Sequence, residues 1–190
     1  MGAVTITESK YLTDEEADHL IALCKQNKQD RDSILIRLLL YTGARGCEVL
    51  SLTAKDFSNQ GTVTIRGAKG SNARTVPLTS DDYLFPTEIR AYITTYNIRP
   101  NQRLFPITTR RLRQIWDFWR PNKHKGSHSI RHTTGIKFYL ACEDIHKVKS
   151  LLGHRQINNT QVYLDFCHGT RTLGKAMKGM WKKRISEEKE

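Results

Sequence analysis

Six side chains of this sequence are of the types that can together cleave a phosphodiester bond without a metal ion: Arg45, Lys69, His128, Arg131, His154 and Tyr163. An arginine grips two phosphate oxygens through its planar guanidinium, and a pair of arginines offsets the charge that grows on those oxygens in the transition state. A tyrosine hydroxyl, with a pKa of about 10, becomes a nucleophile when a group such as histidine accepts its proton. A lysine on a turn is a suitable acid for the leaving 5′-hydroxyl. The set therefore indicates phosphodiester chemistry.

Each of these residues, taken alone, also fits an ordinary structural role. Arg45 with Glu48 at i+3 could form a surface ion pair. Lys69 could be a solvated loop lysine, and Tyr163 could be a core tyrosine. Only the combination of all six in one basic chain favours catalysis over these alternatives.

The histidines His128 and His132 could also belong to a metal site. His128 and His132 are one helical turn apart, which is a spacing that metal ligands use. However, Ser129 stands where an H-E-x-x-H site has its glutamate, and no third ligand lies close by in the sequence. We therefore expect no metal and no cofactor, and we interpret His132 as a buried histidine in a supporting role.

The charge of the chain points to a polyanionic partner. The 31 Lys and Arg residues exceed the 19 Asp and Glu residues, for a net charge of +12. Such an excess is typical of proteins that bind nucleic acid or, less often, an anionic membrane surface.

The four cysteines are scattered, the N-terminus lacks a signal-peptide pattern, and the longest apolar run, 34–41, is too short to span a bilayer. We expect a cytoplasmic protein without a membrane partner, from a prokaryotic cell, a phage or another mobile element.

The hydrophobic periodicity predicts a mainly helical fold with one small antiparallel β-sheet, of the α+β class. Thr13 is a predicted N-cap, because acidic residues fill the turn that follows. The β-rich runs 62–66 and 74–78 flank a Gly-rich turn and predict a hairpin. Helical patterns are predicted for the segments 13–25, 32–42, 46–52, 109–120, 128–141, 143–152 and 158–167.

The motifs that carry these residues resemble those of the tyrosine recombinases, the phage-integrase superfamily. The stretch LLGHRQINNTQVY resembles the family's Leu-Gly-His…Thr-x-x-Tyr signature, and HSIRHTT resembles its His-x-x-Arg-His-Thr. Thr-Gly-Ala-Arg-Gly-Cys-Glu and the hairpin pattern Lys-Gly…Arg-x-x-Pro-Leu precede them in the family's order. The resemblance runs from about Leu12 to Phe166.

The resemblance implies a role for each candidate residue. Arg45 and Arg131 would clamp the scissile phosphate, and Tyr163 would attack it to give a 3′-phosphotyrosyl bond. Lys69 would be the general acid. His128 would act in proton transfer, while His154 would hydrogen-bond the phosphate or help with protons. Glu48 would be a structural support that holds Arg45 in place.

The resemblance also implies an organisation and a partner. Residues 1–11 would be an extension or linker remnant, residues 12–169 the catalytic domain, and residues 170–190 a basic tail helix that packs either on its own domain or on a neighbouring protomer. The chain would be either an excised catalytic domain or a compact enzyme similar to the fimbrial-switch recombinases. It would act on double-stranded DNA as a homotetramer and be monomeric when free. Candidate phosphate contacts are Arg110, Arg111, Arg113, Lys123, Lys125 and Arg155.

The expected activity is metal- and ATP-independent site-specific recombination, that is, cleavage and rejoining of DNA strands. Two other functions stay open at this point. One is DNA relaxation of the type IB topoisomerase kind, which uses the same chemistry without pairing two sites. The other is a regulatory DNA-binding protein that has lost catalysis, although the complete set of six residues argues against it.

Overall fold

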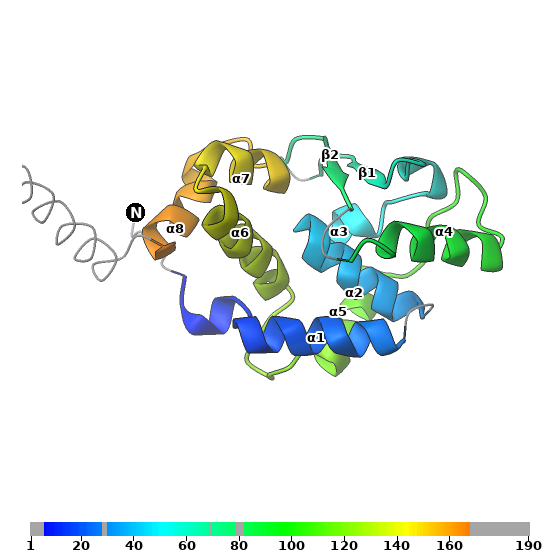
Figure 1. Cartoon of the computed structure of the whole chain (residues 1–190), viewed down its shortest axis with the longest axis horizontal. Helices are drawn as coiled ribbons and strands as arrows, with labels where there is room; N and C mark the ends of the chain where they lie inside the picture. Colours follow the sequence, from blue (N-terminus) through cyan, green and yellow to red (C-terminus); the bar gives the residue numbers. More distant parts are fainter. Residues whose placement is uncertain (1–5, 28–29, 69, 79–81, 168–190) are drawn as a thin grey trace, which may run out of the picture.

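The computed structural model describes residues 6–27, 30–68, 70–78 and 82–167. Within these ranges the chain is helical apart from one hairpin (Figure 1). The helices are η1 (Glu8–Lys10), α1 (Asp14–Gln26), α2 (Arg31–Thr42), α3 (Gly46–Val49), η2 (Ala54–Asp56), α4 (Phe85–Thr95), α5 (Thr109–Trp119), α6 (His128–Cys142), α7 (Ile145–Leu152) and α8 (Asn158–Cys167), and the strands are β1 (Thr62–Ile65) and β2 (Arg74–Pro77). The predicted mainly helical fold with a small antiparallel sheet is confirmed.

Local sequence signals define both ends of the first two helices. Thr13 caps α1 in a capping box with Glu16, since its side chain accepts from Glu16 N and its own N–H donates to the Glu16 carboxylate. The Asp30 side chain caps α2 through the backbone N–H groups of its first turn. Gly43, at φ +58°, ends α2 in the left-handed conformation that glycine adopts without a steric penalty. This stop places Arg45 directly at the start of α3.

The hairpin brings a distant segment to the C-terminal end of α7. β1 and β2 pair antiparallel, with Val63 opposite Val76 and Ile65 opposite Arg74. The segment after the turn then bonds to the corner that follows α7, where Asn72 N–H donates to Gly153 O at 2.9 Å. The hairpin therefore places the segment that follows its turn against this corner.

Helix α6 is the element on which the C-terminal half is assembled. It packs against α2, α7 and α8, and Figure 1 shows it between α7 and α8 on one side and α2 on the other. One apolar core lies around α2, which is buried along nearly its whole length. A second, smaller core joins α6, α7 and α8, and it includes Tyr163.

The described part of the predicted N-terminal extension packs on this second core. Ile6 is buried there beside Ile136 and Tyr139. The ring of Tyr11 meets Phe166 of α8 edge-on, with 5.0 Å between their centroids. Residues 6–11 thus contribute apolar contacts to the helices that carry the candidate site. The predicted tail helix, residues 170–190, lies outside the described residues.

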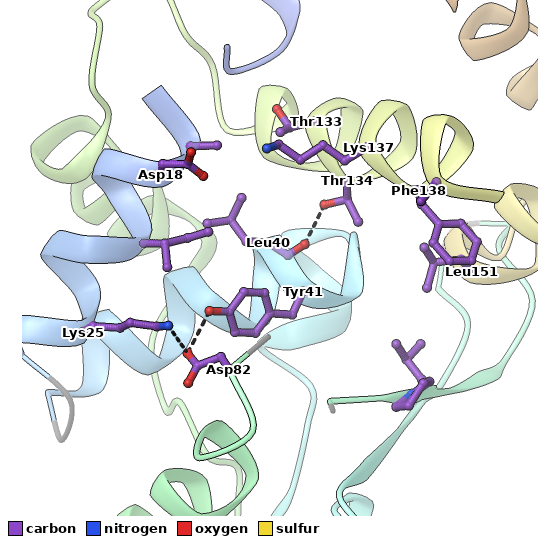
Figure 2. A pocket seen from close by; sticks show the side chains of 15 residues that line it. Asp18, Lys25, Leu40, Tyr41, Asp82, Thr133, Thr134, Lys137, Phe138 and Leu151 are labelled. Atoms are coloured by element: carbon purple, nitrogen blue, oxygen red, sulfur yellow. Dashed lines mark hydrogen bonds and ion pairs between the residues drawn. The ribbon is translucent and has the colours of Figure 1, made fainter. Parts of the chain in front are cut away.

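An apolar groove lies on another face of α6, between α1, α2 and β2 (Figure 2). Its floor includes Leu40 and Leu151, and at one end Lys25 and the Tyr41 hydroxyl both contact Asp82. None of the described candidate catalytic residues lines this groove. Over the same described ranges, no helix is both long and apolar enough to cross a membrane.

A buried arginine joins α2 to α4. The side chain of Arg37 has no exposed surface and forms ion pairs with Asp82 and Glu88, while its guanidinium lies 4.5 Å from the centroid of the Phe85 ring. A buried charge is tolerated only when it is paired and hydrogen-bonded, so removing Arg37 deprives Asp82 and Glu88 of a buried positive charge. This cluster fixes α2, and through it Gly43 and Arg45, relative to α4.

We predict that Arg37→Met lowers the free energy of unfolding by about 3–5 kcal/mol, because two carboxylates lose their buried partner. Urea unfolding followed by circular dichroism measures the change. The matched control is Arg31→Met on the same helix, whose ion pair with Asp32 is partly exposed and contributes at most about 1 kcal/mol. Equal effects of the two substitutions would contradict this account.

Candidate active site

Arg131 occupies the centre of the candidate site. It is 7% exposed, and its two terminal nitrogens donate to Gly43 O at 2.7 Å and to Leu152 O at 2.8 Å. These acceptors lie at the C-terminal ends of α2 and α7, where backbone carbonyls lack intrahelical partners and carry partial negative charge. Burial, and then the nearby charge of Arg45, lower the pKa of Arg131 to about 10. The guanidinium therefore stays charged at neutral pH and joins three helices.

Glu48 is the only carboxylate among the described residues that pairs with the arginines of the site. It is fully buried, and it accepts hydrogen bonds from Arg45 N at 2.9 Å, from Arg74 Nη2 at 3.0 Å and from Ser71 Oγ. Burial alone would raise the pKa of Glu48, but the bonds from Arg74, Ser71 and Arg45 outweigh it and lower the pKa below its usual value. Glu48 therefore stays ionised and ties α3 to the hairpin.

Arg45 and Arg74 retain donors that the protein does not use. Arg45 Nη1 lies 3.6 Å from Glu48 Oε1 but makes no hydrogen bond, and Arg74 Nε has no partner among the described residues either. Both atoms are buried. Sequence reasoning assigned no role to Arg74, although the hairpin motif contains it. Its side chain is 6% exposed and lies in the candidate site.

Lys69 itself lies outside the described residues, but the turn that contains it is anchored on both sides. Ser71 Oγ accepts a hydrogen bond from Ala68 N–H at 3.2 Å and lies 2.8 Å from Ala68 O. Ser71 also forms an isolated β-bridge with His154. The described flanks of the turn are thus held at the corner occupied by His154.

His154 follows Gly153, which ends α7 at φ +69°. The imidazole is nearly buried, and its Nδ1 lies 2.9 Å from Thr160 Oγ1 of α8. Burial, and then the charges of Arg131, Arg45 and Arg74, lower the pKa of His154 to about 3. The ring is therefore neutral near pH 7. It lies almost parallel to the Tyr163 ring, at 7° and 6.5 Å between centroids.

Tyr163 is buried, with 1% of its surface exposed, and its ring lies on the backbone of Gly135. Burial raises the pKa of Tyr163 to about 12, and the charges of Arg131 and Arg45 oppose this rise. Its hydroxyl lies 3.3 Å from His132 Nδ1. The hydroxyl is thus directed toward a possible proton acceptor.

The structure corrects the interpretation of His132. The sequence predicted a buried histidine satisfied in the core, but the ring is half-buried and contacts the candidate nucleophile Tyr163. Burial, and then the charges of His128 and Arg131, lower the pKa of His132 to about 4. Its neutral Nδ1 is available to the tyrosine hydroxyl. A helical pattern alone could not distinguish this orientation from a core orientation.

His128 is the first residue of α6 and is exposed. It lines a cavity of about 290 Å³ together with Arg45, Arg113 and Arg131. Of the predicted catalytic residues that the structure describes, all five thus surround one basic region. Among the described residues, no group of three or more His, Cys, Asp or Glu side chains is placed to hold a metal ion.

The predicted phosphate contacts are exposed, with one exception. Arg110, Arg111 and Arg113 lie on the solvent side of α5, and Lys123 and Arg155 are exposed in loops. Lys125, in contrast, is 3% exposed: its ammonium donates to Tyr11 O at 2.8 Å and lies 3.2 Å from Glu16 Oε2. The prediction of a DNA contact is therefore wrong for Lys125, which joins the N-terminal segment to the loop before α6.

The family model of the phage integrase family matches residues 10–167. The chain belongs to the phage integrase family. It is 31% identical over 182 residues to the tyrosine recombinase XerA of Pyrococcus furiosus, covering 90% of this chain and 60% of that protein. The chain thus spans well under two thirds of the length of this relative.

Solved structures of other members of the phage integrase family show the same fold. The XerH site-specific recombinase bound to its difH substrate is 25% identical, with a TM-score of 0.65 over 82% of this chain and 50% of XerH. The catalytic domain of bacteriophage HP1 integrase is 24% identical, with a TM-score of 0.58, and here the match covers 88% of this chain and 93% of that domain. The described architecture is that of the family's catalytic domain.

We predict that Gly135→Ala lowers the free energy of unfolding by about 1–3 kcal/mol, because a Cβ there would lie 2.7 Å from Cε1 and Cζ of Tyr163. Helix propensity alone predicts the opposite sign, since alanine is a better helix former than glycine. Thermal or urea unfolding measures the change. Gly126→Ala is the control, because nothing lies within 4 Å of the Cβ it would add. A stabilised Gly135→Ala protein would contradict the packing of Tyr163 on α6.

Proposed function

We propose that this chain is the catalytic part of a tyrosine site-specific recombinase, which cleaves and rejoins DNA through a 3′-phosphotyrosyl intermediate. The observation that carries the proposal is the convergence of a buried tyrosine, two neutral histidines and three arginines around one basic region. The composition of this region matches the needs of phosphoryl transfer without a metal ion, and family membership supports the same chemistry.

The arginines would bind the scissile phosphate. Arg131 is held by two helix C-termini, so it enters the reaction already oriented. Arg45 Nη1 and Arg74 Nε are buried donors without a protein partner, and such groups gain most from an anionic acceptor. Preorganised donors of this kind stabilise the charge of a pentavalent transition state. In this proposal they take the part that Mg²⁺ has in other phosphoryl-transfer enzymes.

Tyr163 would be the nucleophile, and it needs a proton acceptor and access to the DNA. His132 Nδ1 is the described acceptor within reach of its hydroxyl. Because only 1% of Tyr163 is exposed, we propose that α8 shifts when DNA binds, so that the hydroxyl reaches the phosphorus. His128, at the rim of the cavity beside Arg45, would serve in proton transfer.

Lys69 would protonate the 5′-oxygen as it leaves, which gives a free 5′-hydroxyl. The tyrosine oxygen forms a bond to phosphorus while the bond from phosphorus to the 5′-oxygen breaks, so one phosphodiester replaces another. Attack by a 5′-hydroxyl reverses the step and releases the tyrosine, so rejoining needs no ATP. We propose double-stranded DNA as the partner, with a homotetramer on two paired sites and a monomer when free.

We predict that Tyr163→Phe abolishes covalent attachment to DNA while leaving DNA affinity within about threefold, because only the hydroxyl is lost. The measurement uses labelled duplexes that tile the DNA around the gene, each nicked near the centre so that the leaving fragment escapes. A denaturing gel then reports label carried on protein. Tyr96→Phe, at the exposed C-cap of α4, is the matched control.

The outcomes of this assay separate the alternatives. A band with the wild type and with Tyr96→Phe, but none with Tyr163→Phe, supports the proposal. Tight binding without a band on any duplex would favour a regulatory DNA-binding protein. Covalent attachment that relaxes supercoiled plasmid without joining two DNA sites would favour the topoisomerase-like activity instead.

We also predict that Arg111→Gln weakens binding to all duplexes alike and reduces the slope of log K against log salt by about 1, as expected for one lost phosphate contact. Fluorescence anisotropy at several salt concentrations measures this slope. Lys125→Gln is the comparison, because its buried ion pair predicts a loss of folding stability with an unchanged slope. A slope unchanged by Arg111→Gln would remove that residue from the DNA interface.

A further inference from the structure

The Thr160 hydroxyl has a single partner among the described residues, and that partner is His154. Thr160 lies in the first turn of α8 and has no exposed surface. Its Oγ1 is 2.9 Å from His154 Nδ1, and His154 Nε2 makes no hydrogen bond within the described chain. His154 is 6% exposed, so both members of the pair are withdrawn from solvent.

The number of protons decides the direction of this bond. A hydroxyl carries one proton, and a neutral imidazole carries one proton on either of its nitrogens. If Nδ1 carried the proton and donated it, the Thr160 hydroxyl proton would be buried without an acceptor, which is unfavourable. If Thr160 donates to Nδ1, every buried group is satisfied, and the imidazole proton sits on Nε2. The burial of Thr160 therefore favours the second arrangement.

The surroundings of His154 are consistent with one ring proton and an anionic ligand. Burial, and then the charges of Arg131, Arg45 and Arg74, oppose a second proton on the ring, which is why its pKa lies well below the ordinary value. His154 also lines a cavity of about 300 Å³ together with Arg74 and Lys149. An Nε2–H group on a ring surrounded by these arginines is suited to donate to a phosphate oxygen.

We propose that Thr160 is a positioning residue that fixes the tautomer of His154, so that Nε2–H donates to the phosphate oxygen and the ring is not a proton acceptor. This inference rests on the proposed function. It chooses between the two roles that the sequence left open for His154. Thr160 is also one helical turn before Tyr163, so the same bond couples the helix of the nucleophile to the phosphate-binding corner.

The test compares Thr160→Val, which keeps the shape but removes the hydroxyl, with Thr160→Ser, which keeps the hydroxyl. Nitrogen-15 spectra of the histidine rings report the tautomer in the free protein, and His154→Gln identifies the signals. We expect the Nε2–H form in the wild type and in Thr160→Ser, and a mixture or the Nδ1–H form in Thr160→Val. With nicked duplex DNA, we expect covalent attachment to slow by about tenfold to a hundredfold in Thr160→Val, as for other residues that orient a reactive histidine.

The inference is overturned by an Nδ1–H ring in the wild type, or by a Thr160→Val protein that keeps both the Nε2–H form and the wild-type cleavage rate. A slow Thr160→Ser protein with the Nε2–H form retained would also count against it, since the hydroxyl would then not be the deciding group. The spectra need no DNA. If the wild type never attaches to DNA, the proposed function fails. The spectra of the free protein still show which nitrogen of His154 carries the proton, so the two failures can be told apart.

Discussion

The candidate site depends on one buried carboxylate. Glu48 accepts hydrogen bonds from the start of α3, from the hairpin turn and from β2, so it joins its own helix to a hairpin that follows 23 to 26 residues later in the chain. Its single negative charge also offsets part of the charge of Arg45 and Arg74, which both form ion pairs with it. Because Arg131 adds a further buried positive charge, the site keeps an excess of positive charge. The same carboxylate therefore holds the basic cluster together and leaves it incompletely neutralised.

Short backbone approaches bring the remaining groups to this cluster. Gly43 and Gly153 end α2 and α7 in the left-handed conformation, and the carbonyls of Gly43 and Leu152 at these ends accept from Arg131. Gly135 lets the Tyr163 ring lie directly on α6. A side chain at any of these glycines would change either the backbone or the distance between helices. The glycines thus set the geometry in which the Arg131 guanidinium donates to two helix ends and the Tyr163 ring lies on α6.

The sequence predicted the elements well wherever the signal was local. The capping box at Thr13, the glycine after Thr42 and the alternation on both sides of the hairpin turn each depend on neighbouring residues, and the elements they predict are present. Lys125 and His132 were misinterpreted because their surroundings come from distant segments, Glu16 in one case and Tyr163 in the other. The sequence contains only a weak indication of the bond between Thr160 and His154. Its periodicity places Thr160 and Tyr163 on one face of a helix, but it does not identify the residues that this face contacts.

The electrostatics of the site indicate why His132 and His154 are neutral before DNA binds. Burial and the nearby positive charges hold the pKa of His132 at about 4 and that of His154 at about 3. A phosphate anion placed among Arg45, Arg74 and Arg131 would offset those charges, and so raise the pKa of both rings. We expect His132, which faces the Tyr163 hydroxyl, to become a stronger proton acceptor at this point, while Thr160 keeps Nδ1 of His154 occupied. The positive charge that binds the substrate would thus restrain the base until the substrate is present, so one set of arginines would control both binding and activation of the nucleophile.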